Sequence, residues 1–382
     1  RAKKMPQAAR VFLDHAASSP LAEPVRAAME QAWRQPGNPS SLHGSGRAAR
    51  RLLEEARESI AADLGAHPTE VVLCSGGTEA NNLAVLGAAG PTGQVLVSAV
   101  EHPSVLEARR VLGERVVVLP VDAQGRVAPA SVAAAVTLDT RLVSVMWVNN
   151  ETGVVQPVAA ITEVAHAAGV LCHTDAVQAV GHLPVDFAAA GVELLSLSGH
   201  KVGGPVGIGA LLVRRGTSLT SPGFGGGQEA KLRSGTVPVA LAVGLAAALR
   251  LAVAGRDAEA ARLAALGERL RAGLAGLPGV RVNTTPPATP AILHVTVDGT
   301  RADDLLLILD AAGIDCSTGS ACTAGVHQPS EVLLAMGRPL ADATGSLRFS
   351  FGPATTTADI DALLAVLPAG VERARLAFQP SA

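Results

Sequence analysis

The sequence predicts an α/β protein built on a large, mostly parallel sheet. Short apolar runs alternate with segments of helical period, and hydrophobic residues make up 48% of the 382-residue chain. Runs that are apolar at consecutive positions are typical of strands buried on both faces, and the segments between them have the length of crossover helices. We expect these strands at residues 71–75, 95–98, 116–120, 142–148, 170–176, 194–198 and 208–213.

The pattern changes after about Ala254. A glycine-rich loop at 223–236 precedes a long Ala/Leu helix that begins near Pro238. Beyond it come a helix, a strand at 291–297, a helix, a loop of small residues at 317–325, a strand at 347–351 and a last helix. We therefore expect a large domain over residues 10–254 and a smaller α+β domain over residues 255–382. We assign residues 1–9 to the smaller domain.

Composition argues against several classes of protein. Lys and Arg number 31 against 33 Asp and Glu, which leaves no positive surplus for direct DNA binding. The most apolar stretch, residues 237–255, contains Pro238, Gly244 and Arg250, so we expect no membrane-spanning helix. Four cysteines without a C-x-x-C pair predict no metal site and no disulfide framework, and favour a reducing cytoplasm.

Gly76, Gly77 and Thr78 stand between a predicted strand and a predicted helix. Glycines let the backbone approach an anion, a helix N-terminus offers free N–H groups, and Thr78 adds a hydroxyl. The pattern is compatible with a phosphate site, but also with an ordinary turn capped by Ser75 or Thr78. It matches neither nucleotide-binding glycine motif.

Asp175 and Lys201 each follow a predicted strand, where ligands of parallel sheets bind. A lysine that can form a Schiff base and a carboxylate that can pair with a pyridinium nitrogen are what pyridoxal phosphate requires. Taken singly, Asp175 is compatible with a helix cap and Lys201 with a solvated loop charge. Their joint placement downstream of a phosphate site favours the cofactor.

Further polar residues follow the strands or interrupt them. His102, after the strand at 95–98, suits ring stacking and proton transfer, or a capping role at a helix start. Asn149 and Asn150 offer amide donors, or turn chemistry. Arg348 is a charge on an otherwise apolar strand and predicts an anionic partner, for which a substrate carboxylate is suited.

The cysteines divide into two kinds. Cys74 and Cys172 lie inside apolar runs and Cys316 ends a strand, which predicts small core residues. Cys322 lies in the small-residue loop STGSACTAG and is the candidate nucleophile. A Cys316–Cys322 disulfide is the alternative, and the expected reducing compartment disfavours it.

These motifs resemble the pyridoxal-phosphate-dependent cysteine desulfurases, in the subgroup with a mobile GSAC cysteine loop. The resemblance covers nearly the whole chain in nine ordered blocks, which are FLDHAASSP (12–20), GNPSSLHGSGR (37–47), SGGTEANN (75–82), EHPS (101–104), NNETG (149–153), HTDAVQ (173–178), SGHKVGGPVGIGAL (198–211), LRSGT (232–236) and GSAC (319–322). It implies the fold type I of pyridoxal-phosphate enzymes and the conversion of L-cysteine to L-alanine. The sulfur would pass as a Cys322 persulfide to an acceptor protein, for iron–sulfur clusters, thio-cofactors or tRNA thiolation.

The resemblance also implies a role for each matching residue. Lys201 would bind the cofactor and move the substrate α-proton, and Cys322 would attack the substrate sulfur. The cofactor ring would be contacted by Asp175, Gln178 and His102, and the substrate carboxylate by Asn150 and Arg348. The cofactor phosphate would be held by Gly77, Thr78, Ser198 and His200, with Thr236 from the second subunit of a homodimer.

Four rival functions stay open on the sequence. Within the fold they are an aminotransferase, which does not need Cys322, and a selenocysteine lyase. Outside it they are a non-catalytic scaffold for sulfur carriers and a Rossmann-type oxidoreductase, although the dinucleotide fingerprint is missing.

Overall fold

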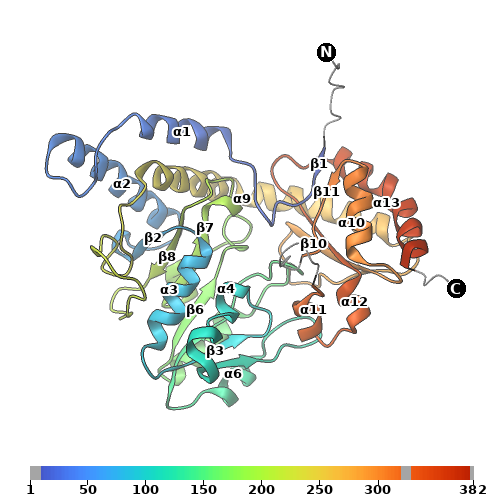
Figure 1. Ribbon diagram of the computed structural model, residues 1–382, viewed down its shortest axis with the longest axis horizontal. Helices are drawn as coiled ribbons and strands as arrows, with labels where there is room; N and C mark the ends of the chain where they lie inside the picture. The colour runs from blue at the N-terminus through green and yellow to red at the C-terminus, as the bar shows by residue number, and fades with distance from the viewer. Residues whose placement is uncertain (1–9, 320–327, 379–382) are drawn as a thin grey trace.

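The computed structural model describes residues 10–319 and 328–378. Within these ranges a seven-stranded sheet forms the centre of the larger lobe (Figure 1). Its spatial order is β2-β8-β7-β6-β5-β3-β4, and all neighbours are parallel except those of β8. The strands are β2 (Val71–Cys74), β3 (Gln94–Ser98), β4 (Val116–Leu119), β5 (Thr140–Ser144), β6 (Leu171–Asp175), β7 (Leu194–Ser198) and β8 (Gly209–Val213).

The predicted α/β class and mostly parallel sheet are confirmed, with two corrections. The run at 142–148 is a regular strand only to Ser144, although the N–H groups of Val145 and Trp147 still donate to β6 carbonyls before the turn at Asn149. The run at 116–120 is not buried on both faces, because β4 is the edge of the sheet and Val118 is half exposed. An edge strand has no second neighbour to cover it.

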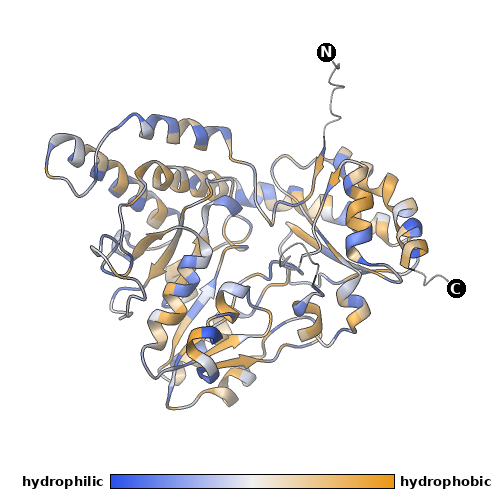
Figure 2. Ribbon diagram, in the orientation of Figure 1, coloured by the Kyte–Doolittle hydropathy of each residue, from blue (hydrophilic) through white to orange (hydrophobic). Residues whose placement is uncertain are grey.

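Helices cover both faces of this sheet. Alternate side chains of the strands enter two separate cores, as Val71 and Leu73 do on one face and Val72 and Cys74 on the other. The first face is covered by α2 (Gly44–Asp63), α6 (Pro129–Ala135), α7 (Val158–Ala167) and the first half of α9 (Val239–Leu274). The second is covered by α3 (Gly77–Ala89), α4 (Pro103–Leu106) and α5 (Arg109–Leu112). Period-two alternation on a doubly covered sheet explains why apolar residues occupy consecutive positions in these runs (Figure 2).

A smaller lobe has its own core. Its three-stranded antiparallel sheet has the order β12-β10-β9 and packs under the second half of α9. A parallel pair joins the N-terminal strand to this lobe, as Figure 1 shows. The elements are β1 (Val11–Phe12), β9 (Val280–Val282), β10 (Ile292–Val297), α10 (Ala302–Ala311), β11 (Ile314–Asp315), α11 (Glu331–Ala335), α12 (Leu340–Thr344), β12 (Ser346–Ser350) and α13 (Thr357–Phe378).

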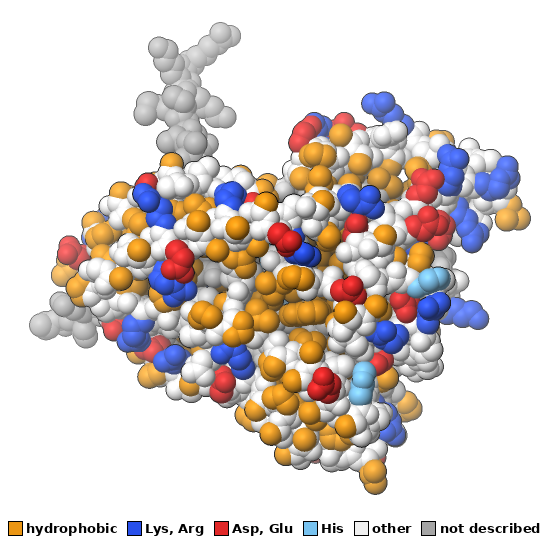
Figure 3. Space-filling view, turned by 180° about the vertical axis from the view of Figure 1, so that it is seen from behind, with side chains coloured by type: hydrophobic (Ala, Val, Ile, Leu, Met, Phe, Trp, Pro, Cys, Tyr) orange, Lys and Arg blue, Asp and Glu red, His pale blue; other side chains and the backbone are white. Residues whose placement is uncertain are grey.

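The remaining elements are short connectors or lie on the rim. They are α1 (Glu23–Trp33), α8 (Phe187–Ala190) and the 3₁₀ turns η1 (Pro68–Glu70), η2 (Gly113–Arg115) and η3 (Gly199–Lys201). On the face seen in Figure 3, side chains of both charge signs are interspersed with hydrophobic ones, as the formal net charge of −2 leads one to expect.

Helix α9 connects the two lobes. It runs unbroken through Gly244 and past residue 254, which confirms the long Ala/Leu helix expected from about Pro238. A Cβ at Gly244 would lie 2.7 Å from Met29 Sδ, so the glycine permits close packing of α1. By length and composition α9 is apolar enough to cross a membrane, a test that core helices of soluble proteins also pass. The domain boundary at 254/255 and the absence of a membrane span stay predictions.

Candidate active site

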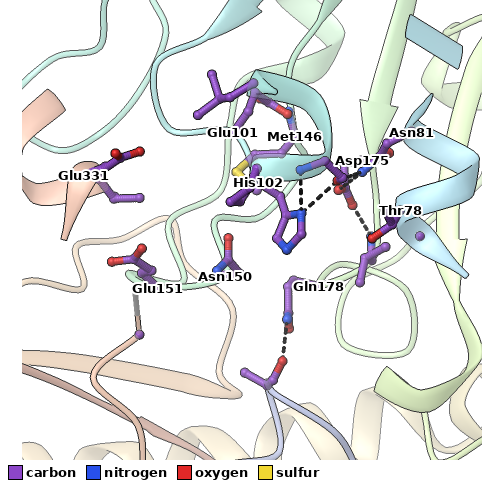
Figure 4. A pocket seen from close by; sticks show the side chains of 18 of the residues that line it. Thr78, Asn81, Glu101, His102, Met146, Asn150, Glu151, Asp175, Gln178 and Glu331 are labelled. Carbon is purple, nitrogen blue, oxygen red and sulfur yellow. Dashed lines mark hydrogen bonds between the residues drawn. The ribbon is translucent and has the colours of Figure 1, made fainter. Parts of the chain in front are cut away.

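A cavity of about 710 Å³ lies at the carboxyl ends of the parallel strands, where the two lobes meet. Side chains from both lobes line it, and Figure 4 shows its central part. The structure brings together here all the predicted site residues except Thr236 and Cys322, namely Gly77, Thr78, His102, Asn150, Asp175, Gln178, Ser198, His200, Lys201 and Arg348.

Lys201 ends the 3₁₀ turn η3 that follows β7. Its Nζ donates to the carbonyl oxygens of Ala16 (2.7 Å) and Ala17 (2.8 Å), so it is not a solvated loop charge. Burial and the nearby positive charge of Arg348 lower the pKa of Lys201 to about 8. An amine with this pKa is partly neutral near pH 7, as a nucleophilic lysine requires.

Asp175 is the last residue of β6 and is buried. Its Oδ2 accepts from Asn81 Nδ2 (2.7 Å) and its Oδ1 from the backbone N–H of Val177 (2.9 Å). The two donors fix the plane of the carboxylate at the cavity wall. This orientation suits a charge-assisted bond to a protonated ring nitrogen.

The turn between β2 and α3 is shaped as an anion site. No side chain caps α3, so the alternative with Ser75 or Thr78 as a cap is wrong. Gly76 has φ 154°, and a Cβ at Gly77 would lie 2.8 Å from Val177 Cγ2. The uncapped N-terminus of a 13-residue helix and the Thr78 hydroxyl therefore face the cavity together.

Two further residues complete this end of the cavity. Ser198 ends β7, and His200 lies close to Ser18, with Nδ1 and Oγ 3.3 Å apart. Burial and the charge of Lys201 lower the pKa of His200 to about 4, so the ring is neutral. Hydroxyl and neutral imidazole groups beside a free helix N-terminus form a donor set that fits a phosphate.

His102 lies at the centre of the cavity in Figure 4. The capping role is confirmed, since its Nδ1 accepts from the backbone N–H of Ser104 (3.1 Å) as the N-cap of α4. Its ring also borders the cavity, and ring stacking and proton transfer stay a prediction. Burial lowers the pKa of His102. Gln178 Nε2 donates to the carbonyl of Ala16 (2.9 Å).

Arg348 enters the cavity from β12 of the smaller lobe. Its anionic partner in the structure is Asp14, whose Oδ1 lies 2.8 Å from Nη2, and Nη1 donates to the carbonyl of Asn150 (2.8 Å). Its buried Nε has no hydrogen-bond partner. The anionic partner predicted for Arg348 is therefore Asp14 of the same chain. Among the described residues, Arg348 Nε is left as a donor without an acceptor.

Two predicted residues are not among those that the structure places at the cavity, for different reasons. Thr236 is exposed in the loop before α9. Cys322 lies outside the described residues. The thiols of Cys74, Cys172 and Cys316 are free and buried, and burial raises the pKa of each to about 12. None of these three is a competing nucleophile.

Several polar residues that line the cavity or contact its lining were given no role in the sequence analysis. Asp14 and Asn81 lie in the quoted blocks FLDHAASSP and SGGTEANN but had no assigned role. Glu101 and Glu151 are buried cavity residues, and burial raises their pKa values to about 8 and about 7. The sequence did contain a signal for these two glutamates, because each is next to a predicted site residue. Glu101 precedes His102, and Glu151 follows Asn150.

Comparison with known proteins now decides the family. The model of the class-V aminotransferases matches residues 11–363. An IscS-like cysteine desulfurase of Mycobacterium tuberculosis is 48% identical over 96% of this chain and 97% of its own length. The chain belongs to the class-V aminotransferases and, within them, to the cysteine desulfurases.

Solved structures of this family agree with the fold. A NifS-like protein from Rickettsia africae has a TM-score of 0.89 and 30% identity, covering 95% of this chain and 99% of its own. SspA, solved in complex with cysteine, has a TM-score of 0.79 and 34% identity, covering 90% and 99%. The predicted fold type I, the pyridoxal phosphate cofactor and the cysteine desulfurase activity are thereby confirmed.

Proposed function

We propose that this cysteine desulfurase passes the sulfur of L-cysteine to Cys322 as a persulfide and releases L-alanine. The observation that carries the proposal is the assembly of Lys201, Asp175 and Arg348 around one cavity, together with Gly319, which begins the GSAC motif, and Pro329, which follows the loop. The relative SspA, solved with cysteine bound, supports the choice of substrate.

The residues that would hold the cofactor are those whose geometry is described above. Thr78, Ser198 and His200 suit its phosphate, Asp175 its ring nitrogen, and Lys201 its aldehyde. When bound, pyridoxal phosphate withdraws electrons from the substrate carbons and so weakens the carbon–sulfur bond.

Two groups of the chain are placed to move protons. Lys201, with its lowered pKa, can accept a proton and return it within the cavity. His102 keeps its Nδ1 as an acceptor for Ser104, which leaves Nε2 for proton transfer. Burial, which lowers the pKa of His102, keeps this ring neutral at pH 7.

Arg348 and Asn150 would bind the substrate carboxylate and so orient the substrate. The guanidinium borders the cavity and is fixed by Asp14 and by the backbone at residue 150, and a planar guanidinium held in this way suits a carboxylate. Binding here would place the substrate thiol on the side of the cavity bordered by Gly319 and Pro329.

The transfer balances without an external oxidant. The Cys322 sulfur forms a bond to the substrate sulfur, the bond between that sulfur and Cβ breaks, and Cβ takes up a proton. Cysteine and a thiol are consumed, and alanine and a persulfide are formed. The persulfide sulfur then passes to an acceptor protein.

Quaternary structure and compartment are also part of the proposal. A homodimer would bring Thr236, exposed and outside the cavity of its own chain, to the phosphate of the second subunit. A reducing cytoplasm agrees with the free thiols of Cys74, Cys172 and Cys316.

The test is alanine release from L-cysteine by the purified protein, measured with persulfide formation on the protein. Cys322→Ser should lose both by more than about 100-fold while it keeps bound cofactor, because the nucleophile is removed. Cys316→Ser is the matched control and should keep both, since Cys316 is buried. Full sulfur transfer by Cys322→Ser would overturn the proposal; turnover of selenocysteine alone, or amino transfer, would favour the rival functions.

A further inference from the structure

Glu151 is a buried carboxyl that the reaction scheme above does not use. Only 6% of it is exposed, and it borders the cavity one residue after Asn150. In Figure 4 it lies with Glu331 on the side of His102 away from Asp175. A buried carboxyl at an active site calls for an explanation, because burial without partners is unfavourable.

The side chain contacts both ends of the stretch that contains Cys322. At the C-terminal end, Ser330 Oγ donates to Glu151 Oε2 at 2.5 Å. The same hydroxyl accepts from the backbone N–H of Leu333 (3.0 Å) and so caps α11. Ser330 is fully buried, which shields this contact from water.

At the N-terminal end, the backbone of Gly319 lies against the same carboxyl. A Cβ at Gly319 would lie 3.4 Å from Glu151 Cγ and 3.5 Å from Oε2. Its φ of +82° is one that residues with a side chain rarely adopt, so the backbone conformation favours glycine, and the Glu151 side chain lies at ordinary van der Waals distance from this position. One carboxyl therefore lies between residues 319 and 330.

The backbone of Glu151 is fixed to the substrate-binding side. Asn149 Oδ1 accepts from the N–H groups of Glu151 (3.0 Å) and Thr152 (2.8 Å), and Asn149 Nδ2 donates to the carbonyl of Val100 (3.0 Å). The neighbouring carbonyl of Asn150 accepts from Arg348. The turn that orients Arg348 is thus also the turn that carries Glu151.

We propose that Glu151 is a positioning residue that ties both ends of the Cys322-bearing stretch to the substrate-binding turn. The inference rests on the proposed function, because it presumes that Cys322 receives the sulfur. It predicts that the tie changes the rate of sulfur transfer to Cys322 and leaves cofactor binding unchanged. Misplacement of a reacting group by about 1 Å can cost on the order of 100-fold in rate.

The charged groups that face Glu151 come from two elements. Arg348 on β12 favours its ionised form, whereas Glu331 on α11 and, above all, burial oppose it, so its pKa is raised to about 7. A hydroxyl binds a carboxylate more strongly than a neutral carboxyl. The bond from Ser330 therefore strengthens as the pH rises through about 7.

The experiment measures persulfide formation on Cys322 in a single turnover of the holoenzyme at saturating L-cysteine, with the cofactor spectrum recorded for each variant. Glu151→Ala should be slower by about tenfold or more, with little change in KM or cofactor content. Glu151→Gln should match the wild type below pH 6, because its amide oxygen still accepts from Ser330. Above pH 8 it should be about fivefold slower, because the charge is missing.

Controls separate positioning from folding and from charge. Glu268→Gln removes an exposed carboxyl of α9 that does not border the cavity, and should keep the wild-type rate. Ser330→Ala removes the hydroxyl that bonds Glu151 and should slow sulfur transfer, as Glu151→Ala does, whereas Ser330→Thr keeps a hydroxyl and should have a rate near that of the wild type. These two variants test the inference even if Glu151→Ala does not fold. Wild-type rates in Glu151→Ala or Ser330→Ala, or a pH profile of Glu151→Gln parallel to that of the wild type, would overturn the inference alone. Absence of persulfide on wild-type Cys322 would instead overturn the proposed function.

Discussion

The two sides of the cavity are built differently. One side, which we call the sheet wall, consists of Thr78, Asp175, Ser198, His200 and Lys201, all at strand ends of the large sheet. The other, the junction wall, consists of Asn150, Glu151, Gly319, Pro329 and Arg348, which come from a turn and from the smaller lobe. Strand ends of one sheet share a fixed spacing, whereas the junction wall depends on how two lobes meet.

The difference is also electrostatic. On the sheet wall the titratable groups are tuned for cofactor chemistry, with the pKa of Lys201 lowered to about 8 and that of His200 to about 4. On the junction wall a buried guanidinium lies near a buried carboxyl, Glu151, whose pKa is raised. The comparison suggests that the sheet wall holds the cofactor and the junction wall holds the parts that move sulfur.

The largest expected effect lies on the sheet wall. Lys201→Ala should lower alanine release by at least about 1,000-fold, because no other described lysine borders the cavity to replace the amine. The absorbance of bound cofactor should change with it. Lys231→Ala, at an exposed position of the glycine-rich loop, is the control and should keep both signals. Activity in Lys201→Ala near that of the wild type would remove the basis for the division into two walls.

A smaller effect is expected on the junction wall, in substrate affinity and not in cofactor content. Arg348→Lys keeps the charge but loses the planar fork, and should raise KM for L-cysteine by about tenfold or more. Steady-state kinetics with cofactor absorbance as the second measurement check this. Arg281→Lys, an exposed arginine on β9 of the same small sheet, should leave KM unchanged. Loss of cofactor in Arg348→Lys would show that the two walls are not separate.

The smallest effect concerns stability at Glu101, which lies between the walls. Its Oε1 accepts from Ser98 Oγ and from the N–H of Met146, both at 2.7 Å, while Oε2 is buried without a partner. Burial raises its pKa to about 8, so its contribution to stability is present below about pH 4.5 and is lost as the pH rises to about 8.

Glu101→Gln removes this dependence on pH. Its melting temperature relative to the wild type should rise between pH 5 and pH 8, because only the wild type loses stability as Glu101 ionises over this range. Thermal denaturation at several pH values measures it. A difference between the two melting temperatures that stays constant with pH would contradict the buried, protonated state of Glu101.

Much of the sheet wall could be predicted from the sequence. The strand at 194–198 was predicted with its observed limits, and Lys201 follows it by a fixed short turn. Asp175 ends β6 within one residue of the predicted strand end. These features are local, since a run of apolar residues and the first polar residues after it lie next to each other in the chain.

The junction wall could be predicted only in part. Arg348 was expected to have an anionic partner, but Asp14, which lies 334 positions away in the chain, could not be named. Glu151 and Ser330 are 179 positions apart, and no motif in either segment predicts their hydrogen bond. Contacts of this kind arise only when both lobes have folded and met.

The sequence by itself determined the fold class, the family and the residues that follow the parallel strands, because apolar runs and contiguous motifs are written locally along the chain. The tertiary structure alone decided which charges are buried, which of them have partners and where their pKa values lie. Burial and distance are properties of segments brought together from distant parts of the chain, and the bonds from Arg348 to Asn150 and from Ser330 to Glu151 join segments of different lobes.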